Sequence, residues 1–137
     1  MHSPDELLQR YVEVWNDQDG QGLADLYHPD AERVSPLGTV RGGDGVRGFA
    51  AGLWRASPDL RIRVTHSAVN GNVLLYEFTD EGTHTGPLAT PRGEVMGSGR
   101  HFRIEGAGVV EMRDDRIASE RVYFDPGSFL RQLGIGS

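Results

Sequence analysis

LRIRVTHSAVNGNVLLYEFTDEGT, residues 60–83, is the stretch that decides the fold. From Leu60 to Val64, apolar and polar side chains alternate with the period of two that is typical of a half-buried β-strand. Asn-Gly-Asn at 70–72 is a hairpin turn signal, and a second strand is predicted from Val73 to Thr83. The stretch therefore predicts an antiparallel β-hairpin with one face turned toward a core.

Three further strands are predicted on either side of this hairpin. A short strand is expected within residues 28–38, where prolines bracket it. Two longer strands are expected over 100–112 and 117–124, after a loop rich in Gly, Pro and Thr that covers 85–99. Residues 60–124 therefore predict a four-stranded antiparallel meander.

Helix signals gather before the hairpin and return at the end of the chain. A capping box from Ser3 to Glu6 opens the first helix. A short second helix follows near residues 20–27, a third covers 42–59, and the last runs from Pro126 to Leu133. Separate helices and strands predict an α+β fold, a curved antiparallel sheet wrapped against three N-terminal helices. We expect a cone-shaped barrel with an internal pocket and a short C-terminal helix.

The composition excludes several classes of protein. The net charge is −6 over 137 residues, and nucleic-acid binding would need a basic face. No apolar run approaches the roughly 20 residues that span a bilayer, and no signal peptide is visible, so we expect a cytoplasmic protein with no membrane or nucleic-acid partner. The chain has no cysteine and no lysine, which excludes thiolate and Schiff-base chemistry. Its five histidines lack paired ligand spacing, so no metal is expected.

Six segments together resemble a known family. They are YVEVWNDQD (11–19), RGGDGVRGF (41–49), SPDLRIRV (57–64), GTHTGP (82–87), GSGRHF (97–102) and DDRIASERVYFDPGSFLRQLG (114–134). Their order resembles the SnoaL-like polyketide cyclases, within the nuclear-transport-factor-2-like or ketosteroid-isomerase-like superfamily. The resemblance implies one such domain over residues 1–137, a site that needs no cofactor, a hydrophobic and polycyclic small-molecule substrate, and a homodimer.

The resemblance also implies a catalytic residue. In the family's cyclases an aspartate near the end of the last strand removes an acidic proton beside a carbonyl, and the enolate closes a ring by aldol addition. The matching residue is Asp125. Its context allows a second interpretation, because aspartate followed by proline is a preferred helix N-cap. Asp125 is thus either a cap or a base.

Strand pairing gives one test of these alternatives. A two-residue turn at Asp114-Asp115 would place Arg121, Tyr123 and Asp125 on the same face as Ile104, toward the cavity. This prediction fails if the register slips by one residue, because a slip reverses the faces. The residues that we predict to contact substrate are Trp15, Trp54, His66, Tyr76, His101, Arg121 and Tyr123.

Three functions remain open at this level. The first is a cofactor-independent cyclase or related isomerase, and the second is a non-catalytic small-molecule-binding domain. The third is epoxide opening or an accessory hydroxylase role. In the hydrolase pattern an aspartate would stand three residues before Asp125, where this chain has Val122. The strand carboxylates could still serve if one lay buried beside an arginine; they are Glu77, Glu105, Glu111 and Glu120.

Overall fold

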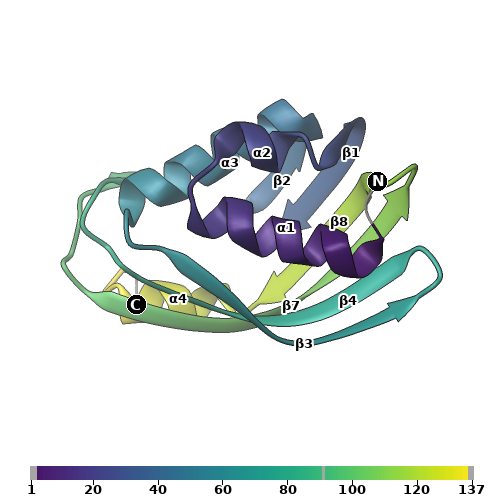
Figure 1. Ribbon diagram of the computed structural model, residues 1–137. Helices are drawn as coiled ribbons and strands as arrows, with labels where there is room; N and C mark the ends of the chain where they lie inside the picture. Colours follow the sequence, from purple (N-terminus) through teal and green to yellow (C-terminus); the bar gives the residue numbers. More distant parts are fainter. Residues whose placement is uncertain (1–2, 91, 136–137) are drawn as a thin grey trace.

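The computed structural model describes residues 3–90 and 92–135. It contains a curved sheet with three helices on one side and a fourth helix at one end (Figure 1). The predicted α+β fold is confirmed. In chain order the elements are α1 (Pro4–Asn16), α2 (Gly20–Ala24), β1 (Tyr27–Ser35), β2 (Gly38–Arg41), α3 (Gly42–Ala56), β3 (Arg61–Asn70), β4 (Val73–Thr83), β5 (Leu88–Thr90), β6 (Gly93–Val95), β7 (His101–Arg113), β8 (Arg116–Phe124) and α4 (Pro126–Gln132).

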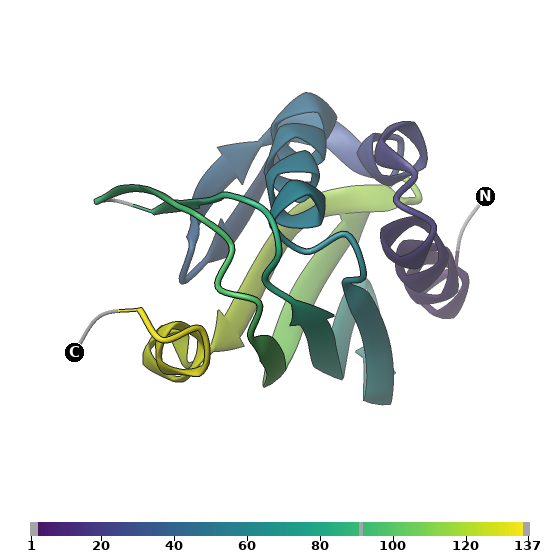
Figure 2. The ribbon, with the colours of Figure 1, turned by 90° about the vertical axis from the view of Figure 1, so that its left-hand side faces the viewer.

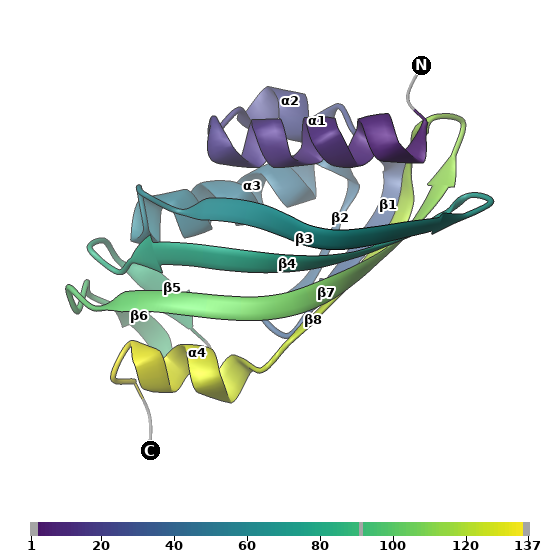
Figure 3. The same ribbon diagram turned by 60° about the horizontal axis from the view of Figure 1, so that its bottom comes forward.

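The main sheet has six strands in the order β2-β1-β8-β7-β4-β3. Adjacent strands in this sheet pair antiparallel, except β1 and β8, which pair parallel. Helices α1, α2 and α3 cover the concave face, and α4 lies across the end of the sheet beyond β8 (Figures 2 and 3). The predicted meander corresponds to β3, β4, β7 and β8. Strand β2 and the small β5-β6 hairpin, which lies inside the predicted loop, were not foreseen from the sequence.

Helix α1 begins as its sequence predicts. The Ser3 hydroxyl accepts a hydrogen bond from the Glu6 amide at 3.2 Å, and the Glu6 carboxylate accepts one from the Ser3 amide at 3.2 Å. This capping box satisfies donors that the first turn would leave unpaired. The buried side chains of α1 then face the sheet: Leu7, Leu8, Tyr11, Val14 and Trp15. Among the described residues, no helix is long and apolar enough to cross a membrane.

Two β-bulges decide which side chains enter the core. In β3 the pairing with β4 shifts between Val64 and His66, so Thr65 is an extra residue. In β8 the pairing with β7 shifts between Ile117 and Ser119, so Ala118 is an extra residue. Each extra residue reverses the alternation of the side chains that follow it. The assignment of side chains to the two faces of each strand, as predicted from the sequence, therefore holds only up to the bulge.

Two glycines of β7 let aromatic side chains of β4 lie against the sheet. A Cβ at Gly108 would overlap the Tyr76 ring, and one at Gly106 would overlap the Phe78 ring. The strand pairing expected from the sequence would have turned Arg121 and Tyr123 toward this same inner face. The bulge in β8 turns those two side chains outward, and the space on the inner face belongs to Tyr76 and Phe78.

Candidate active site

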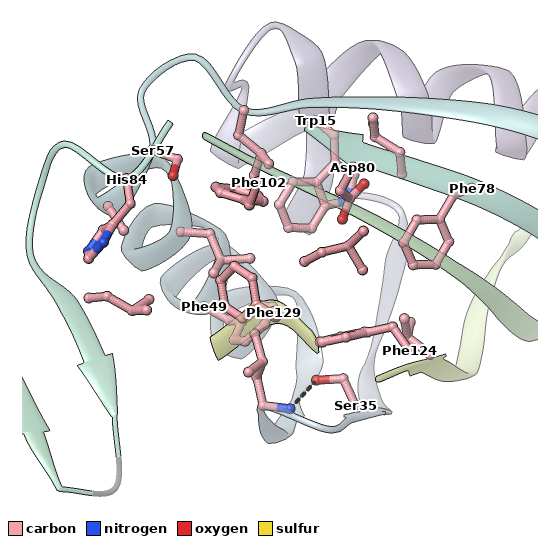
Figure 4. Close-up of a pocket in the computed structure, with 18 of the residues that line it drawn as sticks. Trp15, Ser35, Phe49, Ser57, Phe78, Asp80, His84, Phe102, Phe124 and Phe129 are labelled. Carbon is pink, nitrogen blue, oxygen red and sulfur yellow. Dashed lines mark hydrogen bonds between the residues drawn. The ribbon is translucent and has the colours of Figure 1, made fainter. Parts of the chain in front are cut away.

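An apolar cavity lies between the concave face of the sheet and the helices (Figure 4). Aromatic and aliphatic side chains supply most of its wall, and a few polar groups converge on it. An enclosed apolar pocket with a small number of polar groups is typical of small-molecule sites. The polar or charged residues on its wall include Arg33, Asp80, His84 and Ser57.

Asp80 is the ionisable carboxyl group of this wall. It stands on β4 in phase with Tyr76 and Phe78, and it projects into the middle of the pocket (Figure 4). Its Oδ1 atom is buried and has no hydrogen-bond partner among the described residues. Burial raises the pKa of Asp80 to about 7, against a smaller opposing effect of the Arg33 cation. This carboxyl group can therefore hold or release a proton near neutral pH.

Arg33 supplies the positive charge of the cavity. Its side chain is buried, and its Nε donates to Glu120 Oε1 at 3.0 Å. Its guanidinium carbon lies 4.8 Å from the centre of the Phe49 ring. Among the described residues, neither terminal nitrogen of Arg33 has a hydrogen-bond partner. Burial has the largest single effect and would lower the pKa of Arg33, but Glu120 together with Tyr11, Tyr27 and Tyr76 raises the pKa above its ordinary value, so the side chain stays charged.

Glu120 lies behind this wall and holds it in place. It is fully buried and accepts hydrogen bonds from Arg33, from the Tyr27 hydroxyl and, at 3.0 Å, from the Tyr76 hydroxyl. Burial, above all, raises the pKa of both tyrosines well above the ordinary value, so both keep the protons that they donate. A buried charge with this many donors is paired and satisfied. Glu120 therefore orients Arg33 and Tyr76, and it does not itself line the cavity.

Several buried polar atoms on the wall lack a partner. Trp15 Nε1, Asp80 Oδ1 and His84 Nε2 are all buried and unbonded among the described residues, and all three residues line the cavity. Native proteins pair most buried polar groups, because each unpaired one costs about 1–3 kcal/mol. Three such atoms belong to residues of one cavity wall, and Trp54 Nε1, behind the wall, is a fourth without a partner among the described residues.

The structure places three of the predicted substrate contacts in or beside this cavity. Trp15 and Tyr76 line it. Trp54 is buried but does not line it, and its ring packs edge-on against Trp15 with centroids 5.5 Å apart. Trp54 therefore supports the wall from behind.

The structure places His66 and His101 on the outer surface, contrary to prediction. The bulge at Thr65 turns His66 outward, where it pairs with Glu77 at 3.0 Å. His101 is exposed on β7 beside Glu81, at 3.4 Å, and lines a separate surface groove between α1 and the edge of the sheet. The buried neighbour Phe102 takes the inward position instead.

The structure also turns Arg121, Tyr123 and Asp125 away from the cavity, which corrects the predicted pairing. Arg121 pairs with Val109 and Tyr123 with Ala107, whereas a two-residue turn without a bulge would pair them with Gly108 and Gly106. Val122 and Phe124 therefore line the cavity in their place.

Asp125 is an exposed N-cap of α4. Its Oδ1 accepts hydrogen bonds from the amides of Gly127 at 2.9 Å and Ser128 at 3.3 Å. Its other oxygen lies 3.7 Å from Arg131. The side chain is 68% exposed, so it lacks the apolar surroundings in which enzymes place a catalytic carboxylate. The cap interpretation describes its place in this structure.

Sequence reasoning missed Asp80 and Arg33 as site residues. A signal for Asp80 was present, because Tyr76 and Phe78 alternate with the polar residues Glu77 and Thr79, and Asp80 continues the phase of the two aromatic residues. An acidic residue on the apolar face of a strand indicates a functional or paired group. Arg33 carries no comparable signal. Its counter-charge Glu120 pairs with it on the neighbouring strand β8, but the two residues are far apart in the sequence and the bulge in β8 lies before Glu120.

No metal centre is evident in the part of the chain that the structure describes. No three or more His, Asp or Glu side chains there are grouped as metal ligands.

This curved sheet with a covered cavity is the ketosteroid-isomerase-like α+β fold. A family model for the SnoaL-like domain matches residues 8–120, and the chain belongs to that family. Among curated protein sequences, none matches this chain.

Three solved structures show how varied similar proteins are. IdmH of Streptomyces antibioticus, provisionally assigned as a polyketide cyclase, is 25% identical, with a TM-score of 0.81 over 98% of this chain and 100% of that one. AclR of Streptomyces galilaeus, provisionally assigned as a hydroxylase, is 21% identical, with a TM-score of 0.81 over 96% and 80%. An epoxide hydrolase of M. tuberculosis is 17% identical, with a TM-score of 0.72 over 95% and 88%. One fold thus carries different assignments, and the site must decide the reaction.

Proposed function

We propose that this protein is a cofactor-independent acid–base enzyme that closes a ring in a hydrophobic, polyketide-type carbonyl compound, with Asp80 as the acid/base. The observation that carries the proposal is the Asp80 carboxyl group, whose unpartnered oxygen lies in an apolar cavity and whose pKa is raised to about 7. A general base works best when its pKa lies near the working pH. Asp80 takes the role that the sequence resemblance had given to Asp125.

The first chemical step moves one proton. Ionised Asp80 takes it from a carbon beside a carbonyl group, so the C–H bond breaks and an O–H bond forms on the carboxyl. The electron pair moves to the carbonyl oxygen and forms an enolate. Arg33 lines the same cavity with two terminal nitrogens free to donate. Its fixed positive charge would stabilise the enolate oxygen as it develops.

The second step closes the ring and returns the proton. The enolate carbon attacks a second carbonyl of the same molecule, and a C–C bond forms as that oxygen becomes an alkoxide. Protonated Asp80 gives its proton to the alkoxide, which restores the carboxylate. The two steps balance without any redox partner, and the apolar wall excludes water that would quench the enolate.

An exchange assay tests the base without knowledge of the natural substrate. The ketone 2-acetylnaphthalene is incubated in D₂O, and NMR follows deuterium entering its methyl group, which requires enolate formation. We expect the wild-type protein to accelerate exchange with a rate that rises through a pH of about 7. Asp80→Asn should lower the accelerated rate about 100-fold or more, whereas Asp125→Asn should retain it.

Other outcomes would favour the alternatives. Exchange that survives Asp80→Asn and is lost in Asp125→Asn would restore the assignment made from the sequence. Ligand binding with no accelerated exchange in any variant would make the cavity a binding site only. Glu120 meets the earlier condition of a carboxylate buried beside an arginine, but it accepts hydrogen bonds from Arg33, Tyr27 and Tyr76 and does not itself line the cavity. It is therefore poorly placed to activate water for epoxide opening.

We also propose that two copies pair through the outer face of the sheet. Leu75 and Tyr123 are 47% and 57% exposed there. They flank the β7 residues Val109 and Ala107, with which they pair in register. Such an exposed apolar patch is a common feature of self-association surfaces. Sedimentation of a Leu75→Asp variant tests this, and a wild-type monomer at high concentration would contradict it.

A further inference from the structure

His84 is a buried group that the ring closure described above does not use. It follows directly after β4, it is 1% exposed, and it lines the cavity at the opposite end from Phe78 (Figure 4). Its Nε2 atom is buried without a partner among the described residues. A fully buried imidazole nitrogen on a cavity wall is a candidate ligand contact.

The loop at Ser98 determines which nitrogen of His84 carries the proton. The Ser98 amide lies 3.2 Å from Nδ1, and the Ser98 hydroxyl lies 3.0 Å from the same atom. An amide N–H can only donate, so Nδ1 must accept and carries no proton. In a neutral imidazole the proton then lies on Nε2. His84 therefore carries an N–H donor at Nε2, which is buried at the end of the cavity wall and has no partner among the described residues.

The backbone around His84 is held from both sides, so the ring position is defined. The His84 amide donates to the Arg100 carbonyl at 2.9 Å, and the Gly99 amide donates to the His84 carbonyl at 2.7 Å. Ser98 and its neighbours thus act as positioning residues for the imidazole. A donor that is fixed in place and unpaired favours a ligand that brings an acceptor to it.

Asp80 and His84 lie four residues apart along one strand line. At about 3.3 Å per residue their Cα atoms are about 13 Å apart. The wall between and around them is apolar, and includes Phe49, Leu53 and Phe102. A molecule that reaches both groups must therefore be long and apolar in its middle.

We propose that His84 donates its Nε2–H to a second oxygen of the substrate, remote from the carbonyl group that reacts at Asp80. The substrate class is then an elongated polycyclic compound with an acceptor oxygen, such as a carbonyl or an ether, at each end. This inference rests on the proposed function, because it assumes that the cavity holds the substrate. It adds a specificity determinant at the end of the cavity away from the reacting carbon.

Two probes of equal shape test the donor. 6-Methoxy-2-acetylnaphthalene carries an acceptor oxygen opposite its ketone, and 6-ethyl-2-acetylnaphthalene carries a methylene group in the same place. We expect wild-type protein to bind the methoxy probe about tenfold more tightly, measured by naphthalene fluorescence. His84→Phe keeps a ring and removes the donor, so the two probes should bind alike. His66→Phe, at a histidine that the structure places on the outer face, should keep the preference.

A second measurement needs no variant. Long-range proton–nitrogen NMR of the wild-type protein should show the proton of His84 on Nε2, and that resonance should move when the methoxy probe is added. A proton on Nδ1, or equal binding of the two probes to wild type, would overturn the inference while leaving the cavity as a ligand site. Failure of both probes to bind would contradict the proposed small-molecule function as well, and with it this inference.

Discussion

Strands β4 and β8 both carry carboxylates, and the two strands differ in how their sequence maps onto the sheet. On β4, the pairing with β7 has no bulge from Leu74 to Asp80, so Tyr76, Phe78 and Asp80 share one face of the sheet. On β8, the extra residue Ala118 reverses the alternation, so Glu120 is buried while Arg121 is exposed. Asp80, for which no role was predicted from the sequence, thus lies in the cavity, and Asp125, which was predicted to be catalytic, lies outside it.

The difference teaches that a strand pattern assigns faces only relative to the nearest irregularity. The bulge in β8 leaves no local signal in the sequence, because Ala118 is small and can lie on either face of the sheet. Its effect appears several residues later, where charge and burial must agree with the reversed phase. The following predictions test this comparison, beginning with the largest expected effect.

Removal of the bulge in β8 should have the largest effect. Deleting Ala118 would turn Arg121 and Tyr123 toward the core and expose Val122. We expect the loss to approach the whole stability of a domain of this size, about 5–15 kcal/mol. Circular dichroism and proton–nitrogen spectra should show an unfolded chain. The control is Ala118→Gly, which keeps the residue count and should remain folded, and a folded deletion variant would show that the register can adjust.

Loss of the buried counter-charge on β8 should come next. Glu120→Gln leaves Arg33 without its ion-pair partner and should lower the free energy of unfolding by about 3 kcal/mol. Glu77→Gln removes a carboxylate from the exposed face of β4 and should change it by less than about 0.5 kcal/mol. Urea titrations of both variants measure the difference. Equal effects would mean that the inner and outer faces are not energetically distinct.

The ionisation of Asp80 should appear in the pH dependence of stability. Its pKa is raised from 3.8 to about 7, so the native state binds more protons than the unfolded state between these values. Stability from this group is therefore present below pH 4 and is lost as the pH rises through 7. From pH 5 to pH 9 the wild type should lose about 2–3 kcal/mol relative to Asp80→Asn. Parallel stability curves for the two proteins would contradict the raised pKa.

The cap on α4 should give the smallest effect. Asp125→Ala removes an acceptor for the amides of Gly127 and Ser128 and should cost about 1 kcal/mol. Asp125→Asn keeps a capping side chain and should cost a few tenths of that. Thermal melts measure both variants. A loss much above 1 kcal/mol in Asp125→Asn would mean that the carboxylate does more than cap the helix.

Much of the fold was predictable, because its signals are local. The capping box at Ser3, the turn at 70–72 and the aspartate before Pro126 each act within a few residues, and the structure contains all three. Strand β2 and the β5-β6 hairpin were not predicted, although turn sequences with Pro and Gly stand at residues 35–38 and 90–93. Their strands are three or four residues long, which is too short for the period of a strand to show.

The sequence by itself determined the element order, the α+β class and two wall residues of the cavity, Trp15 and Tyr76. It could do so because helix and strand periods depend on neighbouring residues. Only the tertiary structure decided that Asp80, Arg33 and His84 meet one cavity and that Asp125 does not. There are two physical reasons. Two single-residue bulges reverse the faces of their strands, and the pKa and energetic effect of a charged side chain depend on its burial and on partners that are far away in the sequence.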